Sequence, residues 1–159
     1  MTDKVFLIGL TGPTGSGKSE VSRILADRHI PVIDADELAR RVVEPGSACL
    51  KELVREFSDD ILHEDGSLNR RQLARREDTR LLNSITHPYI IDLTKRILMQ
   101  LEQIREPVAV LDAPLLFESG MDNICDVTVA VVAPRQRRLR RIMERDQLTE
   151  KQAEARMAA

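Results

Sequence analysis

The apolar positions of this chain fall into two kinds of pattern, short continuous runs and longer segments with helical spacing. The short runs have the length of β-strands and cover residues 4–10, 30–34, 107–112 and 125–133. Between the first two runs, residues 18–28 place Val21, Ile24 and Leu25 on one face of a helix. Strands that alternate with helices predict an α/β fold, in which a parallel sheet has helices on both faces. Ligands of such sheets bind at the carboxyl ends of the strands.

A long helical segment, roughly residues 36–105, separates the second and third predicted strands. The sequences EPGS (44–47) and HEDGS (63–67) interrupt it. We also expect a break or kink at His87-Pro88, because the residue before a proline avoids the helical conformation. The segment is too long for a simple crossover, which favours a helical insert that covers the strand ends and binds a second substrate. The alternative is that these helices only add stability.

Composition narrows the possible classes of protein. With 159 residues, 42% of them hydrophobic and 31% charged, the chain is long enough for one domain with a substantial core. A net charge of −2 argues against a general nucleic-acid binder, and the scarcity of aromatic residues argues against base stacking. No apolar stretch approaches the ~18 residues of a membrane span, and the N-terminus shows no cleavable signal pattern. Cys49 and Cys125 lie far apart without metal-binding spacing, so we expect reduced thiols in a cytoplasmic protein. Separately, we expect a monomer or a small homo-oligomer.

Residues 11–20 read TGPTGSGKSE and match the phosphate-binding pattern G-x-x-x-x-G-K-[ST] between a predicted strand and a predicted helix. Its glycines allow successive N–H groups to face one anion, and the helix directs its positive end to the same place. We expect Lys18 to reach the β- and γ-phosphates of a nucleoside triphosphate and the Ser19 hydroxyl to bind Mg²⁺. An ordinary glycine-rich turn is the alternative, but every fixed position matches. The candidate ATP-binding residues are Gly12, Pro13, Thr14, Gly15, Ser16, Gly17, Lys18, Ser19 and Glu20.

Aspartates at the predicted strand ends are candidates for the chemistry. The chain lacks the N-K-x-D motif of regulatory GTPases and is shorter than a motor or transporter ATPase, whereas small-metabolite kinases have this size. Asp34 ends the second predicted strand and Asp36 follows it, where a carboxylate can accept a proton, orient an attacking hydroxyl or bind Mg²⁺ through water. The alternative for Asp36 is that it caps the next helix. Asp112, at the end of the third strand, is a candidate to hold Mg²⁺ through water.

The segment 134–149 is rich in arginine, as is the mobile lid of small kinases. Its arginines are Arg135, Arg137, Arg138, Arg140, Arg141 and Arg145. Beside an anion site such a helix neutralises charge on the transferred phosphoryl group, and Arg141 and Arg145 share a face. A solvated basic face is the alternative for several of the six. Thr149 and Gln152 have capping-box spacing at the start of a further helix.

Together these motifs resemble the dephospho-CoA kinase family. The matching segments are GLTGPTGSGKS (9–19), VIDADELARRVVEPG (32–46), DGSLNRRQLA (65–74), ITHPYI (85–90), LDAPLLFESG (111–120) and RRIMERDQLTEKQAEARMAA (140–159). They follow the family's order and spacing across essentially the whole chain. The resemblance implies a P-loop kinase fold of the nucleotide-kinase type. It also implies transfer of the γ-phosphoryl group of ATP, with Mg²⁺, to the ribose 3′-hydroxyl of dephospho-CoA, the last step of coenzyme A synthesis.

The resemblance also implies roles for single residues. Asp36 matches the family's proposed catalytic base, and the lid with its adjoining region falls in residues 134–159. The expected catalytic residues are Asp36, Lys18, Arg141 and Arg145. The expected substrate-binding residues are Asp34, Arg40, His87, Pro88, Pro114, Leu115, Glu118 and Arg156.

The chain departs from the family pattern in three places. The phosphate-binding loop has Pro13-Thr14 where Gly-Ile is frequent, and Glu20 stands where Thr is frequent. Family members usually continue beyond the end of this chain with a strand and a helix, so we expect the first or fourth strand to form an exposed edge. Two other functions stay open: another small-molecule kinase, such as a nucleoside monophosphate kinase, and a nucleotide-binding protein without catalysis.

Overall fold

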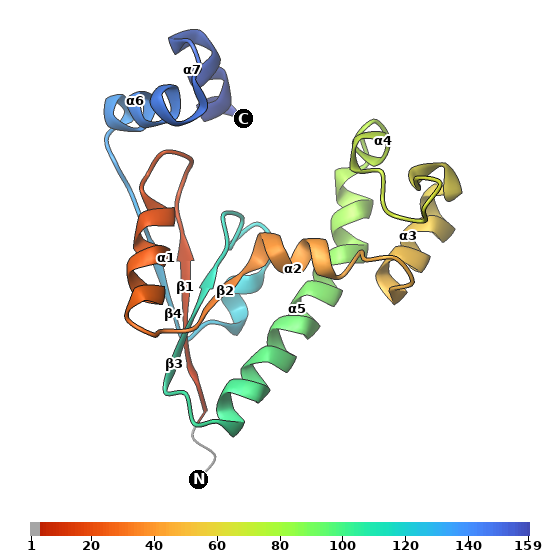
Figure 1. The fold of residues 1–159 in the computed structure, drawn as a ribbon, viewed down its shortest axis with the longest axis horizontal. Coiled ribbons are helices and arrows are strands. Elements are labelled where there is room, and N and C mark those ends of the chain that lie inside the picture. The colour runs from red at the N-terminus through yellow and green to blue at the C-terminus, as the bar shows by residue number, and fades with distance from the viewer. Residues whose placement is uncertain (1–3) are drawn as a thin grey trace. The chain divides into compact units, whose positions relative to one another are not determined.

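The computed structural model describes residues 4–159, which divide into two compact units (Figure 1). The sheet unit comprises residues 4–33 and 107–159, and the helical unit comprises residues 34–106. The helical unit nearly coincides in range with the insert expected over residues 36–105. Among the described residues, no helix has the length and apolar character needed to cross a membrane.

Four strands form the sheet of the sheet unit. They are β1 (Phe6–Thr11), β2 (Val32–Asp34), β3 (Val108–Asp112) and β4 (Val127–Ala130). Their order is β2-β3-β1-β4, and β1 pairs in parallel with both of its neighbours, with Gly9 opposite Leu111 and Thr128. This sheet confirms the α/β fold that the alternation of strand and helix patterns predicts. The carboxyl ends of β1 and β3 lead into the phosphate-binding loop and into the segment after Asp112.

Burial differs between the centre and the edge of this sheet. Leu7 in β1 and Val110 in β3 are at most 1% exposed, whereas all four residues of the edge strand β4 are exposed. Helix α1 (Lys18–Asp27) contains no buried residue, and Ile24 is 43% exposed, so its expected apolar face is not part of the buried core. The core beside β1 instead contains Leu116 and Met121. Leu116 lies before η2 (Met121–Ile124), and Met121 is its first residue. Helical spacing identifies an apolar face but does not determine what covers it.

Two helices complete the sheet unit after β4, namely α6 (Arg135–Asp146) and α7 (Glu150–Ala158). They pack together through a small apolar cluster around the buried Leu139, Ile142 and Ala153. The predicted capping box is present, because the Thr149 hydroxyl accepts the N–H of Gln152 and the Gln152 side chain accepts the N–H of Thr149. This cap fixes where α7 begins.

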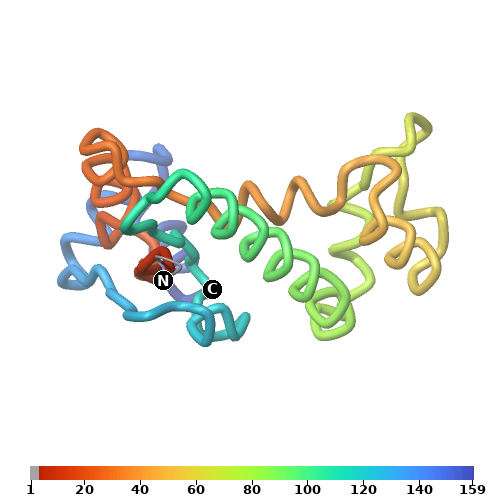
Figure 2. The backbone as a smooth tube through the Cα atoms, turned by 90° about the horizontal axis from the view of Figure 1, so that it is seen from below, coloured from red at the N-terminus to blue at the C-terminus, as the bar shows by residue number. Residues whose placement is uncertain are grey.

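The helical unit contains four helices and a short 3-10 turn. They are α2 (Ala35–Arg41), α3 (Ala48–Phe57), η1 (Asp59–Ile61), α4 (Arg70–Ala74) and α5 (Thr79–Gln103). Each α-helix begins at a polar residue whose side chain accepts backbone N–H groups, namely Asp34, Ser47, Asn69 and Asp78. The long α5, green in Figure 2, packs against α2 and α3. The core of the unit therefore lies along one side of α5.

Of the break or kink expected at His87-Pro88, the break is wrong, because helix α5 continues through Pro88. Proline lacks the N–H that would bond the carbonyl group four residues earlier, and this loss normally disfavours a helix interior. Ile85 and Ile90, on either side of the proline, are buried at 6% and 7% exposure. Their burial holds both halves of the helix in the core, which outweighs the local preference.

Candidate functional site

The loop between β1 and α1 leaves backbone N–H groups available for an anion. Gly17 is the N-cap of α1 with a φ of 100°, in the left-handed region that favours glycine, and it has no side chain to cap the helix. The first N–H groups of α1 therefore face outward at the positive end of the helix dipole. The neighbouring Ser16 is only 4% exposed, and its hydroxyl has no hydrogen-bond partner within residues 4–159. Because an unsatisfied buried hydroxyl is costly, a ligand that bonds to it is favoured.

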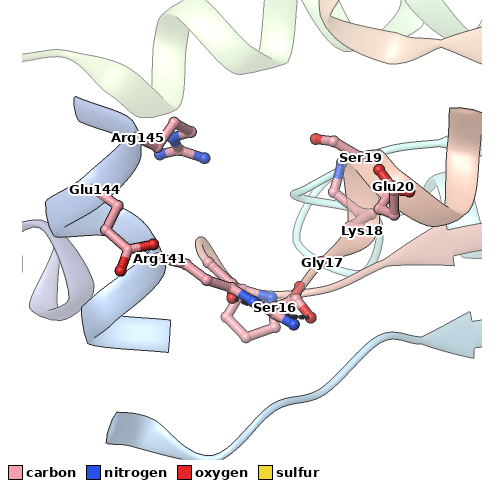
Figure 3. A pocket seen from close by; sticks show the side chains of 10 residues that line it. Ser16, Gly17, Lys18, Ser19, Glu20, Arg141, Glu144 and Arg145 are labelled. Carbon is pink, nitrogen blue, oxygen red and sulfur yellow. Dashed lines mark hydrogen bonds between the residues drawn. The ribbon is translucent and has the colours of Figure 1, made fainter. Parts of the chain in front are cut away.

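A pocket of about 640 Å³ lies against this loop. Its lining residues are Pro13, Gly15, Ser16, Gly17, Lys18, Ser19, Glu20, Arg141, Glu144 and Arg145. Figure 3 shows Lys18, Ser19 and Glu20 on one side, in the first turn of α1, and the two arginines with Glu144 on the other side, on α6. The volume is typical of small-molecule sites. The pocket brings together most of the residues expected to bind ATP. Gly12 and Thr14 belong to the same loop but do not line it.

Lys18 does not extend freely into the pocket, because its Nζ is ion-paired with Asp112 Oδ1. Parallel pairing of β3 with β1 brings the end of β3 close to the loop that follows β1. Ser22 donates its hydroxyl to the other oxygen of Asp112 at 2.6 Å. The sequence indicated Lys18 and Asp112 separately and missed Ser22. The spacing could have indicated Ser22, because it lies four residues after Lys18 and therefore on the same face of the helix.

Two arginines of α6 bind the loop through its carbonyl groups. Arg138 Nε donates to the carbonyl oxygen of Thr14 at 3.0 Å. Arg141 Nη1 donates to the carbonyl oxygens of Gly15 and Ser16, at 3.2 Å and 2.9 Å (Figure 3). Arg141 therefore both lines the pocket and bonds to its floor. Arg138 was not among the expected site residues, although it lies three residues before Arg141 on the same face.

Arg145 and Arg156, the other two arginines of residues 134–159 among the expected site residues, share one carboxylate. Arg145 bonds Asp146 through two nitrogens, at 2.8 Å and 2.9 Å, and Arg156 is ion-paired with the same side chain. These bonds, mainly those from Arg145, lower the pKa of Asp146 to about 2. Arg145 lines the pocket, whereas Arg156 is not one of its lining residues.

Of the two neighbouring aspartates Asp34 and Asp36, only Asp34 uses its side chain to cap α2. Asp34, not Asp36, caps α2, because its Oδ1 accepts the N–H groups of Asp36 at 2.9 Å and Glu37 at 3.3 Å. The alternative in which Asp36 caps this helix is therefore wrong. Asp36 is exposed, and within residues 4–159 its carboxylate accepts no hydrogen bond. It remains available for a ligand.

Comparison with known proteins identifies the family. The sequence profile of the family described as dephospho-CoA kinase matches residues 6–159. This chain belongs to the dephospho-CoA kinase family. A dephospho-CoA kinase of Moorella thermoacetica is 44% identical to it over 161 residues, which covers 98% of this chain and 76% of that protein. A dephospho-CoA kinase of Corynebacterium glutamicum is 44% identical over 155 residues, covering 94% of this chain and 80% of that protein.

Solved structures agree with this membership. A crystal structure of a Thermus thermophilus protein superimposes with a TM-score of 0.75 at 37% identity, covering 96% of this chain and 78% of that chain. A dephospho-CoA kinase from Campylobacter jejuni superimposes with a TM-score of 0.66 at 26% identity, with the same coverage of 96% and 78%. The family resemblance and the kinase fold expected from the sequence are both confirmed.

Three of the residues expected to bind the acceptor in this dephospho-CoA kinase family member lie on helices of the helical unit. Arg40 is exposed on α2, and Pro88 is exposed on α5. His87, also on α5, is half-buried, and this burial lowers its pKa. At neutral pH the imidazole is therefore mainly uncharged, and it offers one donor and one acceptor rather than a positive charge.

Three more of these residues lie in the segment after β3, in the sheet unit. The buried Leu116 anchors this segment, and the Thr11 hydroxyl donates to the carbonyl oxygen of Pro114 at 3.2 Å. Leu115 is 57% exposed, and Glu118 is also exposed. The segment is thus held at its base while an apolar side chain and a carboxylate remain accessible.

Proposed function

We propose that this protein transfers the γ-phosphoryl group of ATP to the ribose 3′-hydroxyl of dephospho-CoA and releases coenzyme A and ADP. Membership of the dephospho-CoA kinase family supports this acceptor. The observation that supports a phosphoryl donor is the pocket at the start of α1, where the phosphate pattern, an uncapped helix N-terminus and two arginines meet. The reaction forms a bond between the acceptor oxygen and phosphorus and breaks the bond between the β- and γ-phosphates.

The phosphates of ATP occupy this pocket in the proposal. Backbone N–H groups of the loop bond to phosphate oxygens, and so does the buried Ser16 hydroxyl, which has no hydrogen-bond partner within residues 4–159. Lys18 binds the β- and γ-phosphates as a point charge. Arg141 and Arg145 face the same pocket from α6 and stabilise charge on the transferred group.

The residues around Lys18 also suit Mg²⁺ in their chemistry. Mg²⁺ prefers oxygen ligands and usually takes one or two protein groups together with waters and substrate phosphates. Ser19 is exposed in the first turn of α1 and lines the pocket, and Asp112 supplies a carboxylate that contacts the adjacent Lys18. We propose that Ser19 holds Mg²⁺ directly and Asp112 holds it through water. The ion, when bound, neutralises part of the negative charge on the β- and γ-phosphates.

Asp36 is the proposed catalytic base. Its carboxylate is exposed and is not used to cap α2, so it is free to orient the 3′-hydroxyl and to accept its proton. The helical unit, with Arg40, His87 and Pro88, and the segment after β3 are proposed to bind dephospho-CoA. Asp34 contributes by fixing the start of α2, on which Asp36 lies.

The test is ADP release by this chain with Mg²⁺ and ATP, compared between dephospho-CoA, AMP and no acceptor. We expect release only with dephospho-CoA. Release with AMP alone would show a different nucleotide kinase. Binding of ATP without release for any acceptor would show a nucleotide-binding protein without catalysis.

Replacing Asp36 by asparagine tests the proposed base. We expect turnover to fall by roughly 10²–10⁴, the usual contribution of a positioned base, while ATP affinity changes little. The matched control is Glu37→Gln, which makes the same carboxylate-to-amide change one residue further along α2. It leaves the Asp34 cap in place, and its turnover should stay within about twofold of the original enzyme. Equal losses in both variants would show that the effect comes from α2 and not from the base.

A further inference from the structure

The Asp112 carboxylate connects two residues of α1 that are one helical turn apart. One of its oxygens is ion-paired with Lys18, and the other accepts the Ser22 hydroxyl at 2.6 Å. The Lys18 and Asp112 side chains are 17% and 14% exposed, so both charges are largely shielded from water. Each charge is therefore strongly dependent on its partner.

A triphosphate changes this arrangement, because it competes with Asp112 for the same ammonium group. The incoming phosphates also bring several negative charges next to the carboxylate. Like charges at this distance repel, which weakens the hold of Asp112 on Lys18 when ATP binds. Once Lys18 is engaged elsewhere, Ser22 is the remaining side chain that bonds to Asp112 within residues 4–159.

We propose that Asp112 is the counter-ion of Lys18 in the free protein, and that Ser22 is a positioning residue that holds the Asp112 carboxylate in place when a triphosphate engages the lysine. The proposal rests on the proposed function only in that the pocket takes ATP together with Mg²⁺. Because Ser22 occupies Oδ2, the oxygen that Lys18 releases is Oδ1. That oxygen becomes available to a water molecule bound to Mg²⁺. One carboxylate thus serves first the lysine and then the metal.

The first test is ATP affinity without metal, measured by calorimetry in the presence of EDTA. Asp112→Asn should bind ATP about fivefold to tenfold more tightly than the original protein, since it frees Lys18 and removes a nearby negative charge. The control is Asp27→Asn, which makes the same change on α1 at an exposed residue that pairs with Arg23. It should alter this affinity by less than about twofold. Unchanged or weaker metal-free binding by Asp112→Asn would overturn the counter-ion role.

The second test is the Mg²⁺ concentration that half-maximally strengthens ATP binding. Ser22→Ala should raise it about tenfold, as expected when an outer-shell partner of a metal site is removed, and should leave metal-free affinity nearly unchanged. Ser22→Thr keeps the hydroxyl and should restore the original value. A loss that appears equally with and without Mg²⁺, or no change at all, would overturn the role of Ser22.

Neither measurement requires turnover or dephospho-CoA. If the original protein binds ATP but phosphorylates no acceptor, the proposed function fails while both tests remain decisive. If the original protein does not bind ATP, both the proposed function and this inference fail.

Discussion

Replacing Gly15 by alanine tests how closely α6 lies on the phosphate-binding loop. Gly15 has a φ of 77°, and a Cβ added there would lie 2.8 Å from the carbonyl oxygen of Arg138 and 3.1 Å from Ile142 Cγ1. The first contact is with backbone, and Ile142 is fully buried, so neither neighbour yields easily. Either the loop or the helix must therefore move.

The cost has two parts that the structure separates. A non-glycine residue in the left-handed region costs roughly 1–2 kcal/mol. Forcing a methyl group into a packed contact adds about 1–3 kcal/mol. Gly15→Ala should thus lower the free energy of unfolding of the sheet unit by roughly 2–5 kcal/mol. ATP affinity should fall as well, because displacement of α6 breaks the bonds from Arg138 and Arg141 to the loop carbonyls.

The measurement is urea unfolding of each variant, followed by ATP titration. The matched control is Gly120→Ala, in the same unit, where φ is 73° and a Cβ would meet only Asn123 Nδ2 at an ordinary 3.6 Å. It has the backbone cost without the steric one, so it should lose only about 1–2 kcal/mol and keep its ATP affinity. Equal destabilisation by the two variants would refute the close contact between α6 and the loop.

Two further predictions follow from pKa shifts. Arg145, and to a smaller extent Arg156, lower the pKa of Asp146 from 3.8 to about 2, so the ionised form stabilises the end of α6 and its ion pair with α7 above about pH 4, and this contribution is lost as the pH falls from 4 to 2. Helical circular dichroism should show this loss, and Asp146→Asn should lack it; identical acid profiles would contradict the prediction. Burial raises the pKa of Cys49 and Cys125 from 9.0 to about 11, so at pH 8 both should react with iodoacetamide about 100-fold more slowly in the native protein than in urea. Equal rates before and after unfolding would show that neither thiol is shielded.

Local features of the site were predictable from the sequence. Residue spacing is enough to find three features that depend on residues close together in the chain. They are the strand before the phosphate-binding loop, the helix after it and the capping box at Thr149. The identity of the family followed from the same segments. These are the features for which propensity, periodicity and motif spacing agree.

Contacts between distant parts of the chain were not predictable in the same way. Ser22 meets Asp112 across 90 residues, and Arg138 meets the carbonyl group of Thr14 across 124 residues. Both depend on the register of β1 against β3 and on where α6 packs, which no local pattern encodes. Pro88 illustrates the reverse case, where a reliable local preference is overridden by buried neighbours in α5.

The number of basic residues in the sequence does not tell how many positive charges of the pocket are available to a phosphate. Three cationic side chains line it, and two of them already have carboxylate partners, Lys18 with Asp112 and Arg145 with Asp146. Arg141 donates only to carbonyl oxygens within residues 4–159, so its positive charge is not neutralised by a neighbouring carboxylate. A phosphate entering the pocket therefore meets one available charge at once and gains Lys18 only by displacing Asp112. Arg141 therefore attracts the phosphate first, and Lys18 is released from Asp112 afterwards.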